Sequence, residues 1–134
     1  MSNLNVFLNP AQVENETVVV SKRFLDEQGT PVPFVIRPIT QRENDLLVRQ
    51  STRTVKVNGQ PVEKLDNVEY SRRVVVAATV IPDFTSEELC RAYGTMDPLE
   101  VPGKMLLVGE YNKLSAAIMA LSGLEDDLEE QAKN

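Results

Sequence analysis

The chain has 134 residues, of which 42% are hydrophobic and 25% charged, and its formal net charge is −6. This composition is typical of one globular domain, and the acidic balance argues against nucleic acid as a partner. Cys90 is the single cysteine, which excludes an internal disulfide and fits a reducing compartment. Because the sequence shows neither a bilayer-length apolar run nor a signal-peptide pattern, we expect a cytoplasmic protein with no membrane partner.

Residues 17–40 predict a β-hairpin around which the rest of the chain is organised. β-Branched and aromatic side chains favour strands, because they fit a pleated, half-buried surface. Asp26 to Gly29 supplies the turn, where Gly29 can adopt the positive φ that a hairpin loop requires. The apolar strand residues are Val18, Val19, Val20 and Phe24 in the first strand and Phe34, Val35, Ile36 and Ile39 in the second.

Three capping boxes predict where helices begin. In each box a Thr or Asp side chain can accept from an early backbone N–H, while a Glu three residues later reaches back. The helical assignment of residues 66–81 competes with the strand propensity of its valines and Ile81, and we expect helix. The boxes are Thr40 with Glu43, Asp66 with Glu69, and Thr85 with Glu88, for helices near 40–50, 66–81 and 85–93.

A second hairpin is predicted between the first two of these helices. Asn58-Gly59, flanked by Val57 and Val62, is a strong two-residue hairpin signal because both turn residues tolerate positive φ. Pro61 lacks an N–H, so its strand should lie at an edge. Because an isolated two-stranded ribbon is only marginally stable, we expect it to pack against the rest of the fold.

The last helix is expected over residues 103–122, after a loop at 95–103, and Gly123 is placed to end it. Its apolar residues recur at spacings of four and three, which is typical of an amphipathic helix. We name them as candidate partner-binding residues, although the same pattern also fits a helix that simply closes the core. They are Leu107, Tyr111, Leu114, Ile118 and Leu121.

The predicted fold is therefore α+β, with small antiparallel hairpins packed against four or so α-helices in a single domain. The domain spans residues 17–122. Residues 1–16 are expected to form a flexible N-terminal arm, with an edge strand or a partner-binding arm as the alternative. Residues 123–134 form an acidic tail, with five carboxylates in the six residues from Glu125 to Glu130.

Candidate catalytic and metal sites are scarce. The chain has no histidine, which removes the usual general base, Ser–His and Cys–His pairs, and histidine zinc sites. Cys90 lies near Glu87 and Glu88, whose charges would disfavour a thiolate, so we interpret it as a core residue. The acidic tail lacks the ligand spacing of a calcium loop. We expect no catalytic, cofactor or metal site and no enzyme activity.

The order of these segments resembles a known family, the XkdN-type tail assembly chaperones of PBSX-like prophages. The resemblance covers about residues 17–121. It is carried by Ser21-Lys22-Arg23-Phe24, by Phe34 to Thr40, and by the segment from Asp83 to Leu106, which includes YGTMDPLEVPGKML.

The resemblance implies a non-catalytic protein that binds the tape-measure protein and keeps it soluble while the tail tube assembles. It also implies absence from the finished virion. The tail-tube protein is a second candidate partner, and homo-oligomer formation is left open. Alternatives are a structural tail component or a small cytoplasmic adaptor unrelated to phage.

Overall fold

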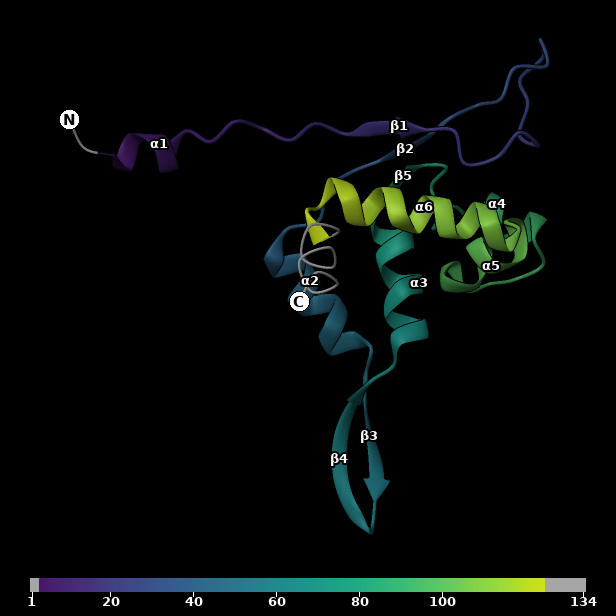
Figure 1. Ribbon diagram of the computed structural model, residues 1–134. Helices are drawn as coiled ribbons and strands as arrows, with labels where there is room; N and C mark the ends of the chain where they lie inside the picture. The colour runs from purple at the N-terminus through teal and green to yellow at the C-terminus, as the bar shows by residue number, and fades with distance from the viewer. Residues whose placement is uncertain (1–2, 125–134) are drawn as a thin grey trace.

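The computed structural model describes residues 3–124 and confirms the predicted α+β class. A three-stranded sheet lies against the helices, and a two-stranded ribbon projects from them (Figure 1). The helices are α1 (Leu4–Leu8), α2 (Gln41–Gln50), α3 (Asn67–Ala78), α4 (Glu87–Ala92), α5 (Val101–Met105) and α6 (Val108–Leu121), with a 3-10 turn η1 at Pro98–Glu100. The strands are β1 (Glu16–Val18), β2 (Phe34–Ile36), β3 (Thr52–Val57), β4 (Gln60–Leu65) and β5 (Thr79–Ile81).

The first sheet is antiparallel with the order β1-β2-β5, and its central strand β2 supplies the core. Phe34 and Ile36 are two residues apart, so both side chains face the same side, where they are buried. The predicted pairing of the two segments is confirmed, but the regular strands are shorter than expected. Val20 is buried outside β1, and the Phe24 ring packs against Phe34 with 6.0 Å between centroids.

The predicted turn between these segments is present. Asp26 organises it, because its Oδ1 accepts from the N–H groups of Gln28 and Thr30, both at 2.9 Å. Gly29 has φ +80°, a left-handed conformation that side chains disfavour. The side chain of Asp26 thus supplies hydrogen bonds to the turn that backbone carbonyls would supply in a tight hairpin.

Two of the three predicted capping residues begin their helices as expected. At α2, the Glu43 N–H donates to Thr40 Oγ1 (3.2 Å) and the Thr40 N–H donates to the Glu43 carboxylate (3.3 Å), which completes a capping box. At α3, the Glu69 N–H donates to Asp66 Oδ1 at 3.1 Å. The Glu69 carboxylate instead lies 3.3 Å from the Arg53 guanidinium, so this box is only half formed.

The third capping prediction is wrong by one residue. Ser86, not Thr85, is the N-cap of α4, and its Oγ accepts from the Leu89 N–H at 3.3 Å. Thr85 is held by Asp83 Oδ1, which accepts from its N–H (3.0 Å) and its hydroxyl (2.6 Å). An Asp two residues before a Thr favours this local turn, and the turn delays the helix.

The predicted helix over 66–81 is wrong for its last three residues, Thr79 to Ile81, which form β5. Thr79 ends the helix, and its hydroxyl donates to the Val75 carbonyl at 2.7 Å. β5 then pairs with β2, which gives the backbone groups of two β-branched residues sheet partners. The competing strand propensity therefore prevails only where a neighbouring strand is available.

The last predicted helix is divided in two. The stretch expected to be a loop contains η1 and the start of α5, and Pro102 lies in the first turn of α5. The chain then turns at Leu106 and Leu107 before α6 begins. Gly123 has φ +84° just after α6, as predicted.

The second predicted hairpin is confirmed as the β3–β4 ribbon. Asn58 (φ +53°) and Gly59 (φ +79°) form its turn, and Pro61 pairs with Lys56 in a ribbon of two edge strands. The ribbon projects from the helices and does not pack along them, contrary to expectation (Figure 1). Its support comes from the base, where the Asp66 N–H donates to the Ser51 carbonyl at 2.8 Å.

One hydrophobic core joins β2 and α3 to the later helices, which agrees with a single domain. Cys90 belongs to this core, as predicted. The described part of the acidic tail is Gly123 and Leu124; Glu125 and the residues after it lie outside the described range. The buried apolar residues are Val20, Phe34, Ile36, Leu47, Val74, Val75, Ala78, Phe84, Cys90, Val101, Met105, Leu106, Leu114 and Ile118.

Candidate partner-binding groove

An apolar hollow of about 510 Å³ lies where the first turns of α3 face α5 and the start of α6. We call it the α3–α6 groove. Val68 and Val108 on its walls are 62% and 80% exposed, so apolar surface is open to solvent there. The lining residues are Asn67, Val68, Ser71, Arg72, Gly103, Leu106, Val108 and Tyr111.

The turn between α5 and α6 is fixed by an ion pair. The Arg23 guanidinium donates to both Glu110 carboxylate oxygens, at 2.5 and 3.0 Å, and also to the Met105 carbonyl at 3.0 Å. The same carboxylate accepts from the Leu107 N–H at 2.8 Å. Arg23 therefore joins the β1–β2 loop to the residues that position one wall of the groove.

This network also sets the protonation of Glu110. Hydrogen bonds from the Arg23 side chain first, then from Ser21 and the Leu107 N–H, stabilise the carboxylate and lower the pKa of Glu110 to about 2. The carboxylate remains charged throughout the neutral range. The start of α6 is thus held by an anion, which is the favourable charge at a helix N-terminus.

A second link crosses the floor of the groove. The hydroxyls of Ser71 on α3 and Tyr111 on α6 share a hydrogen bond of 2.7 Å. Arg72, also on α3, is exposed and makes no hydrogen bond or ion pair within residues 3–124. The groove therefore combines apolar walls with one unpaired cation.

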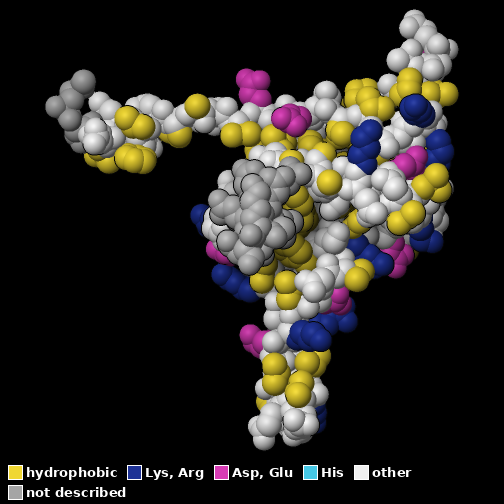
Figure 2. All heavy atoms as spheres, in the orientation of Figure 1, with side chains coloured by type: hydrophobic (Ala, Val, Ile, Leu, Met, Phe, Trp, Pro, Cys, Tyr) yellow, Lys and Arg dark blue, Asp and Glu magenta, His cyan; other side chains and the backbone are white. Residues whose placement is uncertain are grey.

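The ribbon continues this surface. A hollow of about 400 Å³ lies at its base, and Asn67 lines both hollows. The other residues that line it are Arg53, Val55, Lys64, Leu65 and Asp66. Val55 and Val62 are opposite each other in the ladder, so they share one ribbon face. Figure 2 shows hydrophobic side chains along the ribbon with Lys and Arg near its base.

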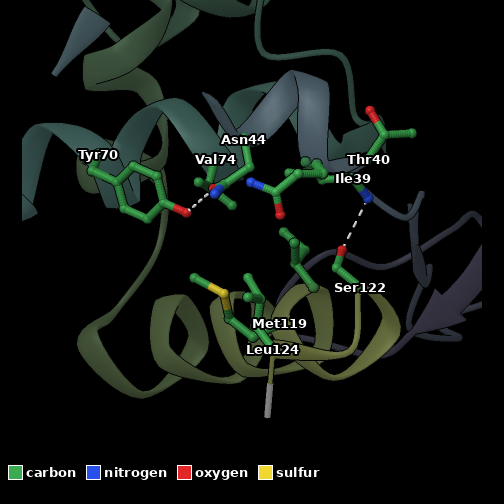
Figure 3. Close-up of a pocket in the computed structure, with 10 residues that line it drawn as sticks. Ile39, Thr40, Asn44, Tyr70, Val74, Met119, Ser122 and Leu124 are labelled. Atoms are coloured by element: carbon green, nitrogen blue, oxygen red, sulfur yellow. Dashed lines mark hydrogen bonds between the residues drawn. The ribbon is translucent and has the colours of Figure 1, made fainter. Parts of the chain in front are cut away.

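A third hollow, of about 260 Å³, lies between α2, α3 and the end of α6 (Figure 3). Two hydrogen bonds join polar groups across it. The Ile39 N–H donates to Ser122 Oγ at 2.9 Å, and the Tyr70 hydroxyl donates to the Asn44 carbonyl oxygen. Burial raises the pKa of Tyr70, which keeps its phenol neutral. This hollow lies between elements that pack against each other, and its lining within the described residues offers no nucleophile paired with a general base.

The five candidate residues have different environments. Leu107 is 60% exposed beside the groove, and Tyr111 is half-buried in its lining. Leu114 and Ile118 are fully buried in the core. Leu121 is half-buried at the far end of α6. Of the five candidates, only Tyr111 lines the groove, and Leu107 is exposed next to it in the chain.

Sequence reasoning missed the opposite wall of the groove, which α3 supplies. Val68 lies seven residues before the buried Val75, so both are on nearly the same side of α3. A helical count along α3 identifies Val68 as an apolar residue on the core side of the helix. Its exposure arises because α3 extends beyond the body at that end.

The described residues contain neither a cluster of metal ligands nor a membrane-spanning helix. Across residues 3–124, no three His, Cys, Asp or Glu side chains gather where they could hold a metal ion. None of the helices in that range is both long and apolar enough to cross a bilayer.

Comparison with known proteins identifies the family. The model of the phage XkdN-like tail assembly chaperone proteins matches residues 4–134. The chain belongs to this family. The PBSX phage-like element protein XkdN of Bacillus subtilis (strain 168) is 41% identical over 98% of this chain and 94% of its own length. The B. subtilis protein YqbN is also 41% identical, over 98% of this chain and 93% of its own length.

The fold agrees with that assignment. A crystal structure of YqbN superimposes with a TM-score of 0.78 at 32% identity, covering 92% of this chain and 98% of YqbN. The resemblance seen in the sequence is therefore confirmed for an XkdN-like tail assembly chaperone. Membership of this family implies a non-enzymatic role and interaction with phage tail proteins.

Proposed function

We propose that this XkdN-like chaperone binds the tape-measure protein of its phage and keeps it soluble until tube subunits polymerise around it. It acts in the cytoplasm of the host cell and is absent from the finished tail. The α3–α6 groove is the observation that carries the proposal, because it exposes apolar side chains on a protein whose family assembles tails.

The chemistry of such a partner suits the groove. A tape-measure protein is long and helical, and its apolar stripes would aggregate if they were left bare. An amphipathic helix buries such a stripe by lying in an apolar groove. Val68 and Val108 offer exposed apolar surface on opposite walls, while Arg72 can meet a carboxylate beside the stripe of the partner.

Leu107 and Tyr111 remain in the proposed contact surface. Leu114 and Ile118 act through the core, because their side chains have no exposed surface in this chain. Leu121 lies at the other end of α6, so a partner helix would reach it only by running along the whole of α6. The ribbon face gives the partner a second place to continue beyond the groove.

Co-expression with the cognate tape-measure protein tests this proposal. We expect wild-type chain to keep the partner in the soluble fraction and to remain bound through purification. Val108→Asp places a charge on the exposed groove wall and should abolish solubilisation. Val32→Asp is the matched control, because Val32 is an exposed valine in the β1–β2 loop and should have no effect.

Circular dichroism of both variants establishes that they are folded. A tape-measure protein that pellets equally with and without the wild-type chain contradicts the chaperone proposal. Solubilisation by Val108→Asp at the wild-type level contradicts the groove as the contact surface. Mass spectrometry of purified virions completes the test, and stoichiometric amounts of this chain there would indicate a structural tail component.

A further inference from the structure

The solvent side of α2 carries two arginines that no described residue pairs. Arg42, Leu46 and Arg49 are separated by four and three residues, so they lie along one side of the helix. Both arginines are exposed and make no hydrogen bond or ion pair within residues 3–124, and Leu46 is 52% exposed. We call these three residues the α2 stripe.

The two carboxylates of α2 are engaged elsewhere. The Glu43 carboxylate accepts from the Arg37 guanidinium at 2.6 and 3.1 Å, and Asp45 Oδ1 accepts from Gln41 Nε2 at 2.8 Å. The arginines of the stripe are therefore free to attract other anions. Two exposed cations on either side of a leucine are complementary to an acidic segment that has an apolar residue at its centre.

The sequence that follows α6 has this complementary pattern. The segment from Glu125 to Glu130 has carboxylates at five of its six positions, and Leu128 occupies the remaining one. Acidic residues thus flank one leucine, as arginines flank Leu46 in the α2 stripe. The segment lies outside the described residues, so its place is inferred from the residues that precede it.

The end of α6 brings this segment to the start of the stripe. Leu124, the last described residue, lines the same hollow as Gln41, which directly precedes Arg42 (Figure 3). At the helical rise per residue, the distance along α2 from Arg42 to Arg49 is about 11 Å. Six extended residues reach about 20 Å, so the segment is long enough to follow the stripe from its attachment at Leu124.

We propose that residues 125–130 dock on the α2 stripe of their own chain, with Leu128 against Leu46 and the flanking carboxylates beside Arg42 and Arg49. Exposed ion pairs each contribute little, so the docking is weak, reversible and sensitive to salt. The docked segment competes for α2 with any acidic segment of another protein. The inference does not rest on tape-measure binding, and its test uses this chain alone.

Cleavage of the full chain by a Glu-specific protease measures the docking, because a docked segment must be released before the protease can bind it. The measured quantity is the rate of cleavage after Glu130 at low ionic strength, followed by mass spectrometry. Arg42→Glu combined with Arg49→Glu leaves the cleaved sequence unchanged. It should accelerate this cleavage about two- to tenfold, as expected for the loss of two exposed ion pairs. Salt at about 0.5 M should remove the difference.

A matched control separates the α2 stripe from net charge. Arg72 on α3 and Arg91 on α4 are exposed and make no hydrogen bond or ion pair within residues 3–124. Arg72→Glu combined with Arg91→Glu makes the same change of charge away from α2 and should be cleaved at the wild-type rate. Acceleration equal to that of the stripe variant would overturn the proposal, because the segment would then respond to charge anywhere on the chain.

Reversing the charge of the segment gives the decisive measurement. Asp126→Lys combined with Asp127→Lys should weaken docking on the wild-type stripe and strengthen it on the stripe that carries Arg42→Glu and Arg49→Glu. The stripe substitutions should therefore accelerate cleavage of the native segment and slow cleavage of the reversed one. A change of the same sign in both segments, or no change in either, overturns the proposal.

The apolar contact has its own test. Leu46→Ser should accelerate cleavage after Glu130, whereas Leu25→Ser should not, because Leu25 is equally exposed (53%) but lies in the β1–β2 loop. Circular dichroism establishes that every variant is folded. Cleavage of Leu46→Ser at the wild-type rate would overturn the proposed contact of Leu128 with α2.

Discussion

The two halves of α6 have the same apolar spacing but opposite environments. In the C-terminal half, Leu114 and Ile118 are fully buried against the core. At the N-terminal end, Leu107 directly before the helix is 60% exposed, and Tyr111 is half-buried in the groove lining. Helical spacing therefore tells which residues share a side, whereas the depth of burial depends on what lies opposite each turn.

The elements facing α6 explain the difference. Its buried half packs in the same core cluster as Val74 and Val75 of α3 and Ile36 of β2. Its exposed half faces the start of α3, where Val68 and Ser71 border an open groove. The same helix thus stabilises the fold at one end and offers a binding surface at the other.

Ile118→Ala, in the buried half of α6, should cause the largest loss of stability. Removing a fully buried side chain and leaving a cavity is expected to lower the free energy of unfolding by about 2–5 kcal/mol. Val108→Ala, on the exposed half of the same helix, should change it by no more than about 0.5 kcal/mol. Urea unfolding followed by circular dichroism measures both. Equal losses for the two variants would contradict the division of α6.

Local signals in the sequence predicted much of the fold. The Asn58-Gly59 turn and the caps at Thr40 and Asp66 are present because each depends on atoms only a few residues apart. Ser86 replaced Thr85 as a cap because Asp83 competed for the Thr85 side chain. That competition is also local, and an Asp two residues before a Thr is its visible sign.

The predictions that failed concern contacts between residues far apart in the sequence, which a short stretch of sequence cannot reveal. Thr79 to Ile81 became a strand because β2, some forty residues earlier, offered its edge. The break before α6 is held by Arg23, which lies in a distant loop. The groove could not be predicted from the α6 pattern, because its other wall is Val68 on α3.

Tyr111→Phe tests the floor of the groove and should have a smaller effect. It deletes the hydroxyl that shares a 2.7 Å hydrogen bond with Ser71 and leaves the ring in place. The expected loss in unfolding free energy is about 0.5–1.5 kcal/mol, the net contribution of one such bond. Tyr93→Phe is the control, since the Tyr93 hydroxyl makes no hydrogen bond within the described part of the chain. Equal losses in the two variants would mean that the Ser71 bond contributes nothing measurable.

Glu110→Gln should have the smallest effect, and pH makes it visible. Because the pKa of Glu110 falls from its usual 4.5 to about 2 on folding, the folded state binds fewer protons than the unfolded chain between these values. The stability from the Arg23–Glu110 pair is therefore complete above pH 4.5 and decreases as the pH falls toward 2.

The measurement is the difference in unfolding free energy between wild type and Glu110→Gln across this range. Other carboxylates also have shifted pKa values: Arg37 lowers the pKa of Glu43, and Thr85 lowers the pKa of Asp83. Both variants share those groups, so subtraction isolates Glu110. The difference should be largest near neutral pH, shrink between about pH 4.5 and 2, and be reduced by salt, because Arg23 is 46% exposed. A difference that stays constant with pH would show that the carboxylate charge does not hold the start of α6.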